Sequence, residues 1–427
     1  MFNKKSVNIA VLGSGPAGLT AAHILAEREV DFVLLDRAPR THTHSYALAL
    51  HPDTLELLDA LDMIEPVLDS ALRLRRSTIF DQENQQRAVI DFSELPVKYP
   101  FLAVIGQNEL EAILVQGLAK KGHHPMWNHR VRCIEPSDDA VRFTVDRLTE
   151  GSTGYAVAHT EQEIDKIFEY TADYMIAADG YGSMARKAAN IAFPEFAQSL
   201  DYAVFEFETN SRPLTEMRMM IDGDRTHVYW PLGEGRCRFS FQMPSGFAEK
   251  NSFNTEHQFI DRKAQDSEEL SDTNLDRLLH QHAPWFIGSS KDVKWRVLVH
   301  FEKRLAESFG SGRIWLAGDA AHTAPPAGIL SMNVGMLEGA DLAERLSAET
   351  SNDSRQFHLD AYNLDRVTEW RRMLDIDKQI VGHGSDAKWL LQHRSNIMGN
   401  LPASGQSYTE ILQQLKLDVE VREEERV

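Results

Sequence analysis

Apolar residues near the start of the chain fall into two short continuous runs separated by a helical pattern. Residues 7–12 form the first run, and residues 31–35 form the second. Between them, the stretch from Pro16 to about Glu29 is rich in Ala and Leu at helical spacing. This pattern predicts a β-α-β unit with buried strands, and the second strand ends at Asp36.

The same periodicities predict the elements of the next part of the chain. They are a helix over 51–72, strands over 73–94, a helix over 108–121, a small meander at 131–134 and 141–145, an irregular polar stretch over 147–169, and a buried strand over 174–178. The helix over 108–121 is entered through Gln107.

Between about 195 and 300 the apolar positions alternate in several runs, which predicts a second domain built on a sheet. A charged stretch at 249–278 interrupts these runs and predicts a helix or a solvated excursion. After Ser331 the pattern is mostly helical. The expected fold is an α/β Rossmann-type domain interleaved with a sheet-based substrate domain and a C-terminal helical region. The expected boundaries are 1–75, 100–190 and 296–350 for the first domain, 76–99 and 191–295 for the second, and 351–427 for the helices.

Composition narrows the class of protein. With 427 residues, of which 42% are hydrophobic, the chain can bury two packed cores that share a cleft. The net charge of −19 disfavours nucleic acid and anionic lipid as partners. Cys133 and Cys237 lie in strand-like stretches and are expected to be packed core thiols. No apolar run approaches the roughly 20 residues of a membrane helix, and we expect a cytoplasmic protein that is not an integral membrane protein.

The first strand is followed by a glycine-rich turn, Gly13-Ser-Gly15-Pro-Ala-Gly18. Gly13 permits a tight bend, Gly15 lets the backbone approach a pyrophosphate, and Gly18 lets the helix pack closely on the strand. The N-terminus of that helix then faces negative charge. Asp36 lies 18 residues beyond Gly18, near the distance at which an acidic side chain takes the ribose hydroxyls of an adenosine. A plain strand-turn-helix would leave the clustered glycines unexplained.

A second turn follows the strand-like residues 313–317 and begins with Gly318-Asp319. A carboxylate at a strand end can accept from ribityl hydroxyls while neighbouring backbone amides meet phosphate. Pro325 and Pro326 stiffen the entry to a helix that starts within residues 328–333, whose N-terminal dipole could stabilise negative charge on the pyrimidine edge of a reduced flavin. Two such turns indicate one extended dinucleotide, FAD. His322 is expected to be a hydrogen-bonded structural residue.

With these residues the chain resembles the class A flavoprotein monooxygenases, the family built on the para-hydroxybenzoate hydroxylase fold. The resemblance covers nearly the whole chain. Its further signatures are the Asp179-Gly180 pattern with Ser183 and Arg186 at matching offsets, Gln107, the helix start Leu50-His-Pro-Asp-Thr-Leu-Glu56, and Gly312-Arg313 before Asp319.

The resemblance implies that NAD(P)H reduces FAD and that the reduced flavin with O2 hydroxylates an electron-rich substrate. No metal is expected, and NADH or NADPH would bind transiently because the chain has one dinucleotide fingerprint. Asp179 and Arg186 would help to hold the FAD domain together, although an ordinary surface salt bridge is an open alternative for Arg186. The expected cofactor-binding set is Gly13, Gly15, Pro16, Ala17, Gly18, Asp36, Arg37, Gln107, Val131, Asp179, Gly318, Asp319, Pro326, Gly328, Met332 and Asn333.

Two positions depart from the family pattern. Tyr46 stands where many members have a basic residue, although His42 and His44 are close. The family's Gly-Gly-Gln-Gly run is Gly-Ile-Leu-Ser at 328–331, which places side chains beside the flavin. We expect this change to limit swinging of the flavin or to reshape the oxygen pocket.

The second domain supplies candidates for a substrate pocket. Met217, Met219, Tyr229, Trp230, Phe239 and Phe241 could roof an aromatic pocket, although such stripes are more often plain core. Alternation places Met217 and Met219 together on one face and Phe239 and Phe241 together on one face. It cannot tell which face of the sheet meets the flavin, and no catalytic base is assigned. His227, Tyr229 and Pro326 are weak catalytic candidates. Arg218 is expected to be solvated.

These observations predict an FAD-dependent monooxygenase that uses NAD(P)H and O2 to hydroxylate or epoxidise a hydrophobic, aromatic or polyketide-like small molecule. A flavin oxidase or dehydrogenase on the same scaffold, and a non-catalytic flavin-binding sensor, are the alternatives. The chain has no Trp-x-Trp-x-x-Pro segment, which argues against a halogenase. A homodimer through the C-terminal helices and an exposed charged face explain the last residues equally well.

Overall fold

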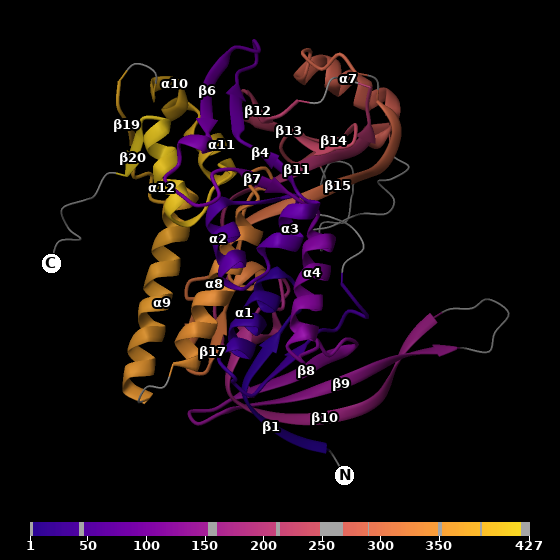
Figure 1. Ribbon diagram of the computed structural model, residues 1–427, viewed down its shortest axis with the longest axis vertical. Coiled ribbons are helices and arrows are strands. Elements are labelled where there is room, and N and C mark those ends of the chain that lie inside the picture. The colour runs from indigo at the N-terminus through magenta and orange to yellow at the C-terminus, as the bar shows by residue number, and fades with distance from the viewer. Residues whose placement is uncertain are drawn as a thin grey trace.

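The computed structural model describes residues 3–41, 47–152, 160–210, 214–247, 268–288, 290–348, 352–384 and 387–419 (Figure 1). His42, His44 and Tyr46 therefore lie outside the described residues. Most of the charged stretch at 249–278 and the chain end at 422–427 lie outside them as well.

A seven-stranded sheet with a parallel centre forms the first layer. Its strands are β1 (Asn3–Leu12), β2 (Phe32–Leu35), β8 (His129–Pro136), β9 (Val141–Ser152), β10 (Thr160–Ala177), β16 (Gly310–Ser311) and β17 (Ile314–Leu316). β1 lies between β10 and β2, β17 pairs with β10, and all three pairings are parallel. Because parallel strands end at one edge of a sheet, the turns after β1, β2, β10 and β17 meet there. The predicted β-α-β unit and parallel sheet are confirmed.

Helices cover this sheet and connect it to the rest of the chain (Figure 1). They are α1 (Pro16–Glu27), α2 (Pro52–Ala60), α3 (Ile64–Ser70), α4 (Gln107–Lys120), α5 (Met184–Ala188), α8 (Leu330–Ser347) and α9 (Asn352–Met373). The helix expected over 51–72 is two helices, because the chain turns at Asp62, which has a φ of 57°. A small sheet of β3 (Ala49–Leu50), β7 (Leu102–Val104) and β4 (Leu72–Leu74) lies beside them.

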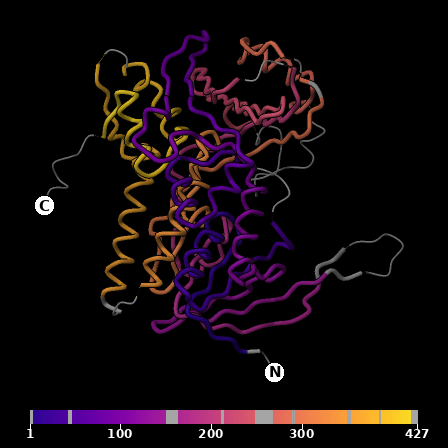
Figure 2. The backbone as a smooth tube through the Cα atoms, in the orientation of Figure 1, coloured from indigo at the N-terminus to yellow at the C-terminus, as the bar shows by residue number. Residues whose placement is uncertain are grey.

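The irregular stretch expected over 147–169 is wrong, since β9 and β10 form a long antiparallel ribbon there. Figure 2 shows this ribbon projecting from the body of the molecule. Residues 163–166 are exposed, including Ile164 at 45%. A two-stranded ribbon that faces water on both sides needs no alternation of apolar and polar residues, so the period-2 signal is absent from its sequence.

The second, eight-stranded sheet confirms the expected sheet-based domain. Its strands are β5 (Arg76–Phe80), β6 (Gln86–Asp91), β11 (Glu195–Glu208), β12 (Met217–Asp222), β13 (Arg225–Gly233), β14 (Arg236–Gln242), β15 (Lys291–Leu305) and β18 (His322–Thr323), in the spatial order β18-β15-β11-β14-β13-β12-β5-β6. β18 follows the Asp319 turn directly and pairs with the end of β15. The second sheet is thereby joined to the edge of the first sheet where the turns meet.

The two faces of the second sheet pack differently, and we call them inner and outer. Inner-face residues Met217, Met219 and Trp230 pack in the same core as the parallel sheet. Outer-face residues pack in a separate core under α7 (Asp272–His282); they are Phe205, Phe207, Met220, Tyr229, Phe239 and Phe241. The six residues considered as a pocket roof are therefore divided between the two faces.

The remaining elements are short, and most of them lie in the C-terminal part of the chain. They are η1 (Phe92–Glu94), η3 (Glu268–Leu270), η4 (Gly318–Ala320), β19 (Ile380–Gly382), α10 (Ala387–Gln392), α11 (Arg394–Ile397), η5 (Met398–Asn400), α12 (Gly405–Gln414) and β20 (Leu417–Val419). Among the described residues, no helix is long and apolar enough to cross a membrane. Cys237 is buried as expected, whereas Cys133 is exposed, because the strand β8 that carries it lies at the edge of its sheet.

Candidate functional site

The turn after β1 has the geometry that its glycines predict. Gly13 has a φ of +97°, and a Cβ there would lie 2.0 Å from the Ala178 carbonyl oxygen. A Cβ on Gly18 would lie 1.9 Å from the Gly13 oxygen. Gly15 differs from both, because a Cβ there would meet no atom of the described residues within 4 Å. Two glycines are therefore required by packing, and the third leaves open space in front of a helix N-terminus.

That N-terminus is equipped to receive an anion. Helix α1 begins at Pro16 after the N-cap residue Gly15, and no side chain caps it. The buried Ser14 hydroxyl has no hydrogen-bond partner among the described residues. Backbone N–H groups at an uncapped helix N-terminus attract phosphate through hydrogen bonding and the helix dipole.

Asp36 and its neighbours lie beside this turn. The Asp36 carboxylate accepts hydrogen bonds from the backbone N–H groups of Ser14 at 2.7 Å and Ala38 at 2.8 Å. An ionised carboxylate has about four lone-pair sites, so these bonds fix its orientation and leave capacity for a hydroxyl. Arg37 is exposed, and Val131 on β8 is half-buried.

The Asp179-Gly180 turn follows β10 at the same edge of the sheet. Asp179 accepts from the N–H of Met184 at 2.8 Å through one oxygen, whereas its buried Oδ1 has no partner within the part of the chain that the structure describes. Burial raises the pKa of Asp179. A Cβ on Gly180 or Gly182 would meet nothing within 4 Å. The turn thus combines open space with an unpaired oxygen.

Arg186 connects two of these turns. Its guanidinium donates to the carbonyl oxygens of Ala320 at 2.7 Å and Tyr181 at 2.8 Å, and it lies over the Phe193 ring at 3.9 Å. The residue is only 5% exposed. Arg186 therefore makes no surface salt bridge, and it ties the Asp179 turn to the Asp319 turn.

A buried carboxylate on α8 accepts a hydrogen bond from the Asp319 turn. No role was predicted for this residue from the sequence. Glu338 on α8 accepts from the N–H of Gly318 at 2.8 Å, from His322 Nε2 at 2.8 Å and from Trp370 Nε1 at 2.7 Å. His322 also stacks on Trp370, with ring centroids 3.8 Å apart. These contacts support the structural reading of His322. Asp319 itself is half-buried, and burial raises its pKa.

Close packing brings the first and last turns together. Helix α8 packs on α1, and a Cβ on Gly339 would lie 2.3 Å from the Ala17 carbonyl oxygen. A Cβ on Gly335 would lie 2.9 Å from the Gly318 Cα. The two turns are far apart in the sequence, and small residues at this contact place them against each other.

Gln107 is the first residue of α4, the helix that packs against α1. Its side-chain oxygen accepts from the N–H of Ala47 at 3.3 Å, and its amide donates to Glu111 at 2.9 Å. Gln107 is half-buried, so its side chain is positioned by these contacts while part of it faces outward.

The loop before α8 carries the residues that depart from the family pattern. Ile329 has a φ of 54° and a ψ of 33°, a left-handed conformation that is rare for a β-branched residue, and it is buried. Asn333 donates to the carbonyl oxygens of Ala49 and Ile329 and accepts from the N–H of His51. Pro326 and Met332 are half-buried beside this loop. Side-chain contacts thus hold the loop in its strained conformation.

His51 belongs to the helix-start signature at 50–56, but the sequence assigned it no role. It is fully buried; its Nε2 donates to the Gly328 carbonyl oxygen at 2.9 Å, and its Nδ1 lies 3.2 Å from the Ser404 hydroxyl. Since a carbonyl oxygen only accepts, Nε2 carries the proton and Nδ1 accepts from Ser404. Burial lowers the pKa of His51 to about 3, and the Gly328 carbonyl opposes that shift. His51 is therefore a neutral imidazole at physiological pH.

This neutral histidine predicts a pH dependence of stability. The pKa of an unfolded histidine is about 6.5, so below that pH the unfolded chain takes up a proton that the folded chain refuses. The contribution of His51 is complete above about pH 6.5 and is lost by about 1.4 kcal/mol per pH unit as the pH falls toward 3. The test is chemical denaturation of wild type and His51→Gln at about pH 4.5 and pH 7.5. We expect the stability advantage of the wild type to shrink at the lower pH, whereas an unchanged difference would contradict the assignment.

His227 and Tyr229 lie on the outer face, away from these turns. Tyr229 packs against Phe239 and Trp285, and the tilted rings of His227 and His282 have centroids 3.9 Å apart. Arg218, expected to be solvated, lies over the Trp285 ring at 4.3 Å with its side chain only 17% exposed. Their position under α7 does not favour contact with a ligand at the sheet edge.

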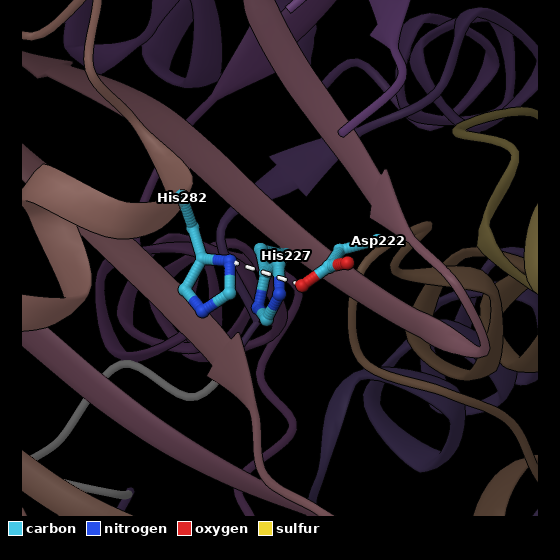
Figure 3. A group of neighbouring side chains, drawn as sticks. All are labelled: Asp222, His227 and His282. Carbon is cyan, nitrogen blue, oxygen red and sulfur yellow. Dashed lines mark ion pairs between the residues drawn. The ribbon is translucent and has the colours of Figure 1, made fainter. Parts of the chain in front are cut away.

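His227, His282 and Asp222 also form the one group of possible metal ligands found among the described residues, with ligand atoms within 4.8 Å (Figure 3). His227 Nδ1 accepts from the backbone N–H of Gln242 at 3.2 Å, so Nε2 of the neutral ring carries the proton and offers no lone pair. The Arg225 guanidinium already pairs with Asp222 at 2.7 Å. These contacts make the group a poor metal site.

The three turns fit FAD as a group. They lie at one edge of the parallel sheet, where Asp36 follows β2 and Asp319 follows β17. Among the described residues they combine an open Gly15, an uncapped helix N-terminus and the unpaired Asp179 Oδ1. Phosphate would meet the helix N-terminus, and the carboxylates would accept from hydroxyls.

Comparisons with known proteins agree with this fit. The chain is 25% identical over 397 residues to pentachlorophenol 4-monooxygenase of Sphingobium chlorophenolicum, covering 88% of this chain and 65% of that one. The structure superposes on p-nitrophenol 4-monooxygenase PnpA from Pseudomonas putida DLL-E4 with a TM-score of 0.69 and 20% identity, covering 96% and 97% of the two chains. It superposes on aklavinone-11 hydroxylase, solved with FAD and aklavinone, with a TM-score of 0.58 and 20% identity, covering 82% and 63%.

The chain spans slightly less than two thirds of the length of the first curated relatives that it matches. The family model described as FAD binding domain matches residues 6–377. That match includes all three turns and most of the second sheet. The expected α/β fold is confirmed, FAD is the cofactor, and the chain belongs to this FAD-binding domain family.

Proposed function

We propose that the protein is an FAD-dependent monooxygenase that uses NAD(P)H and O2 to hydroxylate an aromatic or polyketide-like small molecule. The observation that carries the proposal is that three turns suited to FAD meet at one edge of the parallel sheet, and that the second sheet is joined to the same edge through β18. Proteins similar to this chain are named for pentachlorophenol, p-nitrophenol and aklavinone. When bound, FAD supplies the redox chemistry by accepting a hydride and reacting with O2.

The inner face of the second sheet supports an apolar substrate. By the strand register, Tyr202, Val204, Val297 and Val299 share the face of Met217 and Met219, and they form an apolar cluster separate from both larger cores. Trp295 and Phe301 pack against this cluster and are only partly buried. An apolar surface with a few aromatic side chains is the common lining of a small-molecule pocket.

Polar residues on this face favour orientation of the substrate over proton abstraction. The buried Arg238 pairs with Glu206 at 2.7 Å and lies 4.8 Å from the Trp295 ring. Burial raises the pKa of Tyr202, whose hydroxyl donates to Gln242 at 3.3 Å. Tyr202 is therefore a neutral hydrogen-bonding group at physiological pH.

Ile329→Gly tests whether the altered loop affects the flavin. Glycine adopts the left-handed conformation without the cost of about 1–2 kcal/mol that other residues bear, but it loses burial of about the same size. We therefore expect little change in stability. We also expect a larger fraction of NAD(P)H consumed without product, because the loop beside the flavin becomes less restricted. Product formed per NAD(P)H consumed is the measurement, and unchanged reduction and coupling would count against the effect.

The proposed function is tested by flavin spectroscopy on the purified protein. The flavin absorption band is recorded, then NADH or NADPH is added without oxygen, with and without a panel of phenols and polycyclic phenols. Faster bleaching with one ligand, followed by hydroxylated product on admission of O2, is the expected result. Bleaching by a substrate without NAD(P)H would favour an oxidase or dehydrogenase, and a flavin that never bleaches would favour a sensor. Cytoplasmic location and homodimer formation stay predictions from the sequence.

A further inference from the structure

The loop at 325–330 contacts two parts of the chain that are distant from it in the sequence. A Cβ on Gly328 would lie 2.7 Å from both the Asn400 carbonyl carbon and the Leu401 oxygen, and one on Gly399 would lie 3.3 Å from Pro325. The C-terminal segment 399–404 thus lies directly behind the loop. His51, at the N-terminus of α2, contacts both of them through Gly328 and Ser404.

The geometry of the peptide group shows how these contacts orient the backbone N–H groups of the loop. In a trans peptide the C=O and N–H groups point in opposite directions. The side chain of His51 donates a hydrogen bond to the Gly328 carbonyl oxygen, and the side chain of Asn333 donates one to the Ile329 carbonyl oxygen. The N–H groups of Ile329 and Leu330 therefore point away from these two side chains. Both lie at the start of α8, where backbone N–H groups lack partners within the helix.

We propose that His51 is a positioning residue that links the C-terminal segment 399–404 to the flavin-facing loop and keeps the N–H groups at the start of α8 aimed at the cofactor. The inference rests on FAD binding by this chain and is independent of the substrate. A positioned N–H group stabilises negative charge on a reduced flavin, so His51 affects both FAD affinity and the reduction potential through the loop.

Two isosteric variants separate the contacts of His51. The amide of glutamine takes the place of Nε2 and retains the donor to Gly328. The amide of asparagine takes the place of Nδ1 and retains only the Ser404 contact. The readouts are the FAD dissociation constant of the apoprotein, measured by flavin fluorescence, and the midpoint potential of the bound flavin.

His51→Asn is expected to weaken FAD binding about tenfold, the effect of one lost buried hydrogen bond. It is also expected to lower the two-electron midpoint potential by about 30 mV, which corresponds to a tenfold change in the equilibrium constant. His51→Gln is expected to stay within about twofold of wild type in both readouts. Ser404→Ala, which releases only the C-terminal segment, is expected to weaken FAD binding about threefold.

His23 provides a matched control. It is also fully buried, and its Nε2 lies 2.9 Å from the Leu114 carbonyl oxygen, but this contact joins α1 to α4 and does not involve the loop at 325–330. His23→Asn is expected to lower thermal stability without changing FAD affinity or potential. Equal FAD affinity and potential in His51→Asn, His51→Gln and wild type would overturn the inference. If His51→Asn does not fold, wild-type affinity in Ser404→Ala overturns it instead. Failure of wild type to bind FAD would contradict the cofactor assignment itself.

Discussion

Gly15→Ala is expected to abolish FAD binding while leaving the fold of the apoprotein intact. The backbone at Gly15 has a φ of −76° and a ψ of −179°, which alanine adopts without strain, and the added Cβ would lie more than 4 Å from every described residue outside the turn. The methyl group would occupy the space in front of the α1 N-terminus that the pyrophosphate needs. We expect the FAD dissociation constant to rise at least about 100-fold, or ~2.7 kcal/mol.

The measurement is FAD titration of the apoprotein together with its thermal unfolding. Gly18→Ala is the matched comparison, because its Cβ would lie 1.9 Å from the Gly13 oxygen. That variant should lose thermal stability even without cofactor, by about 1–3 kcal/mol or more. FAD binding by Gly15→Ala with wild-type affinity would show that the cofactor does not approach this turn.

The contrast between Gly15 and Gly18 shows what the sequence could predict. Motif spacing identified both glycines, the strand before them and the helix after them, because these features depend on residues close together in the chain. The second turn was found for the same reason, since Gly318 and Asp319 follow a short apolar run. Local chemistry was sufficient for the turns and for the parallel sheet.

The contacts behind the turns could not be predicted in this way. His51 reaches Gly328 and Ser404 across 277 and 353 positions of sequence. A histidine before Pro52 is consistent with an ordinary helix start, so no nearby residue reveals its partners. Arg186 is similar, because its partner Ala320 lies 134 positions away. Its burial distinguishes it from a surface salt bridge, and burial requires the tertiary structure.

The substrate sheet shows a different limit. Alternation correctly placed Phe239 and Phe241 together on one face and Met217 and Met219 together on one face. It could not determine which face meets the flavin, because both faces of this sheet are covered and both are apolar. Helix α7 covers the face of His227 and Tyr229, which favours the opposite face as the one that meets the flavin. Most of the stretch before that helix lies outside the described residues.

Glu338 gives the second large expected effect, on stability. It is fully buried, and its two oxygens accept from three donors: Gly318 N, His322 Nε2 and Trp370 Nε1. In Glu338→Gln one oxygen becomes an NH2 group that faces donors. The variant therefore leaves buried donors unpaired, at about 1–3 kcal/mol for each such group. We expect a loss of about 2–4 kcal/mol in the free energy of unfolding.

Glu344→Gln on the same helix is the control, because Glu344 is exposed and its change should stay within about 0.5 kcal/mol. Chemical denaturation of both variants, with and without FAD, is the measurement. We expect FAD to stabilise Glu338→Gln less than it stabilises wild type, because the turn at Gly318, where FAD is proposed to bind, no longer has its hydrogen bond to a carboxylate at position 338. A variant as stable as wild type would mean that other side chains or water replace its contacts. In either case the carboxylate would not be what fixes the Asp319 turn.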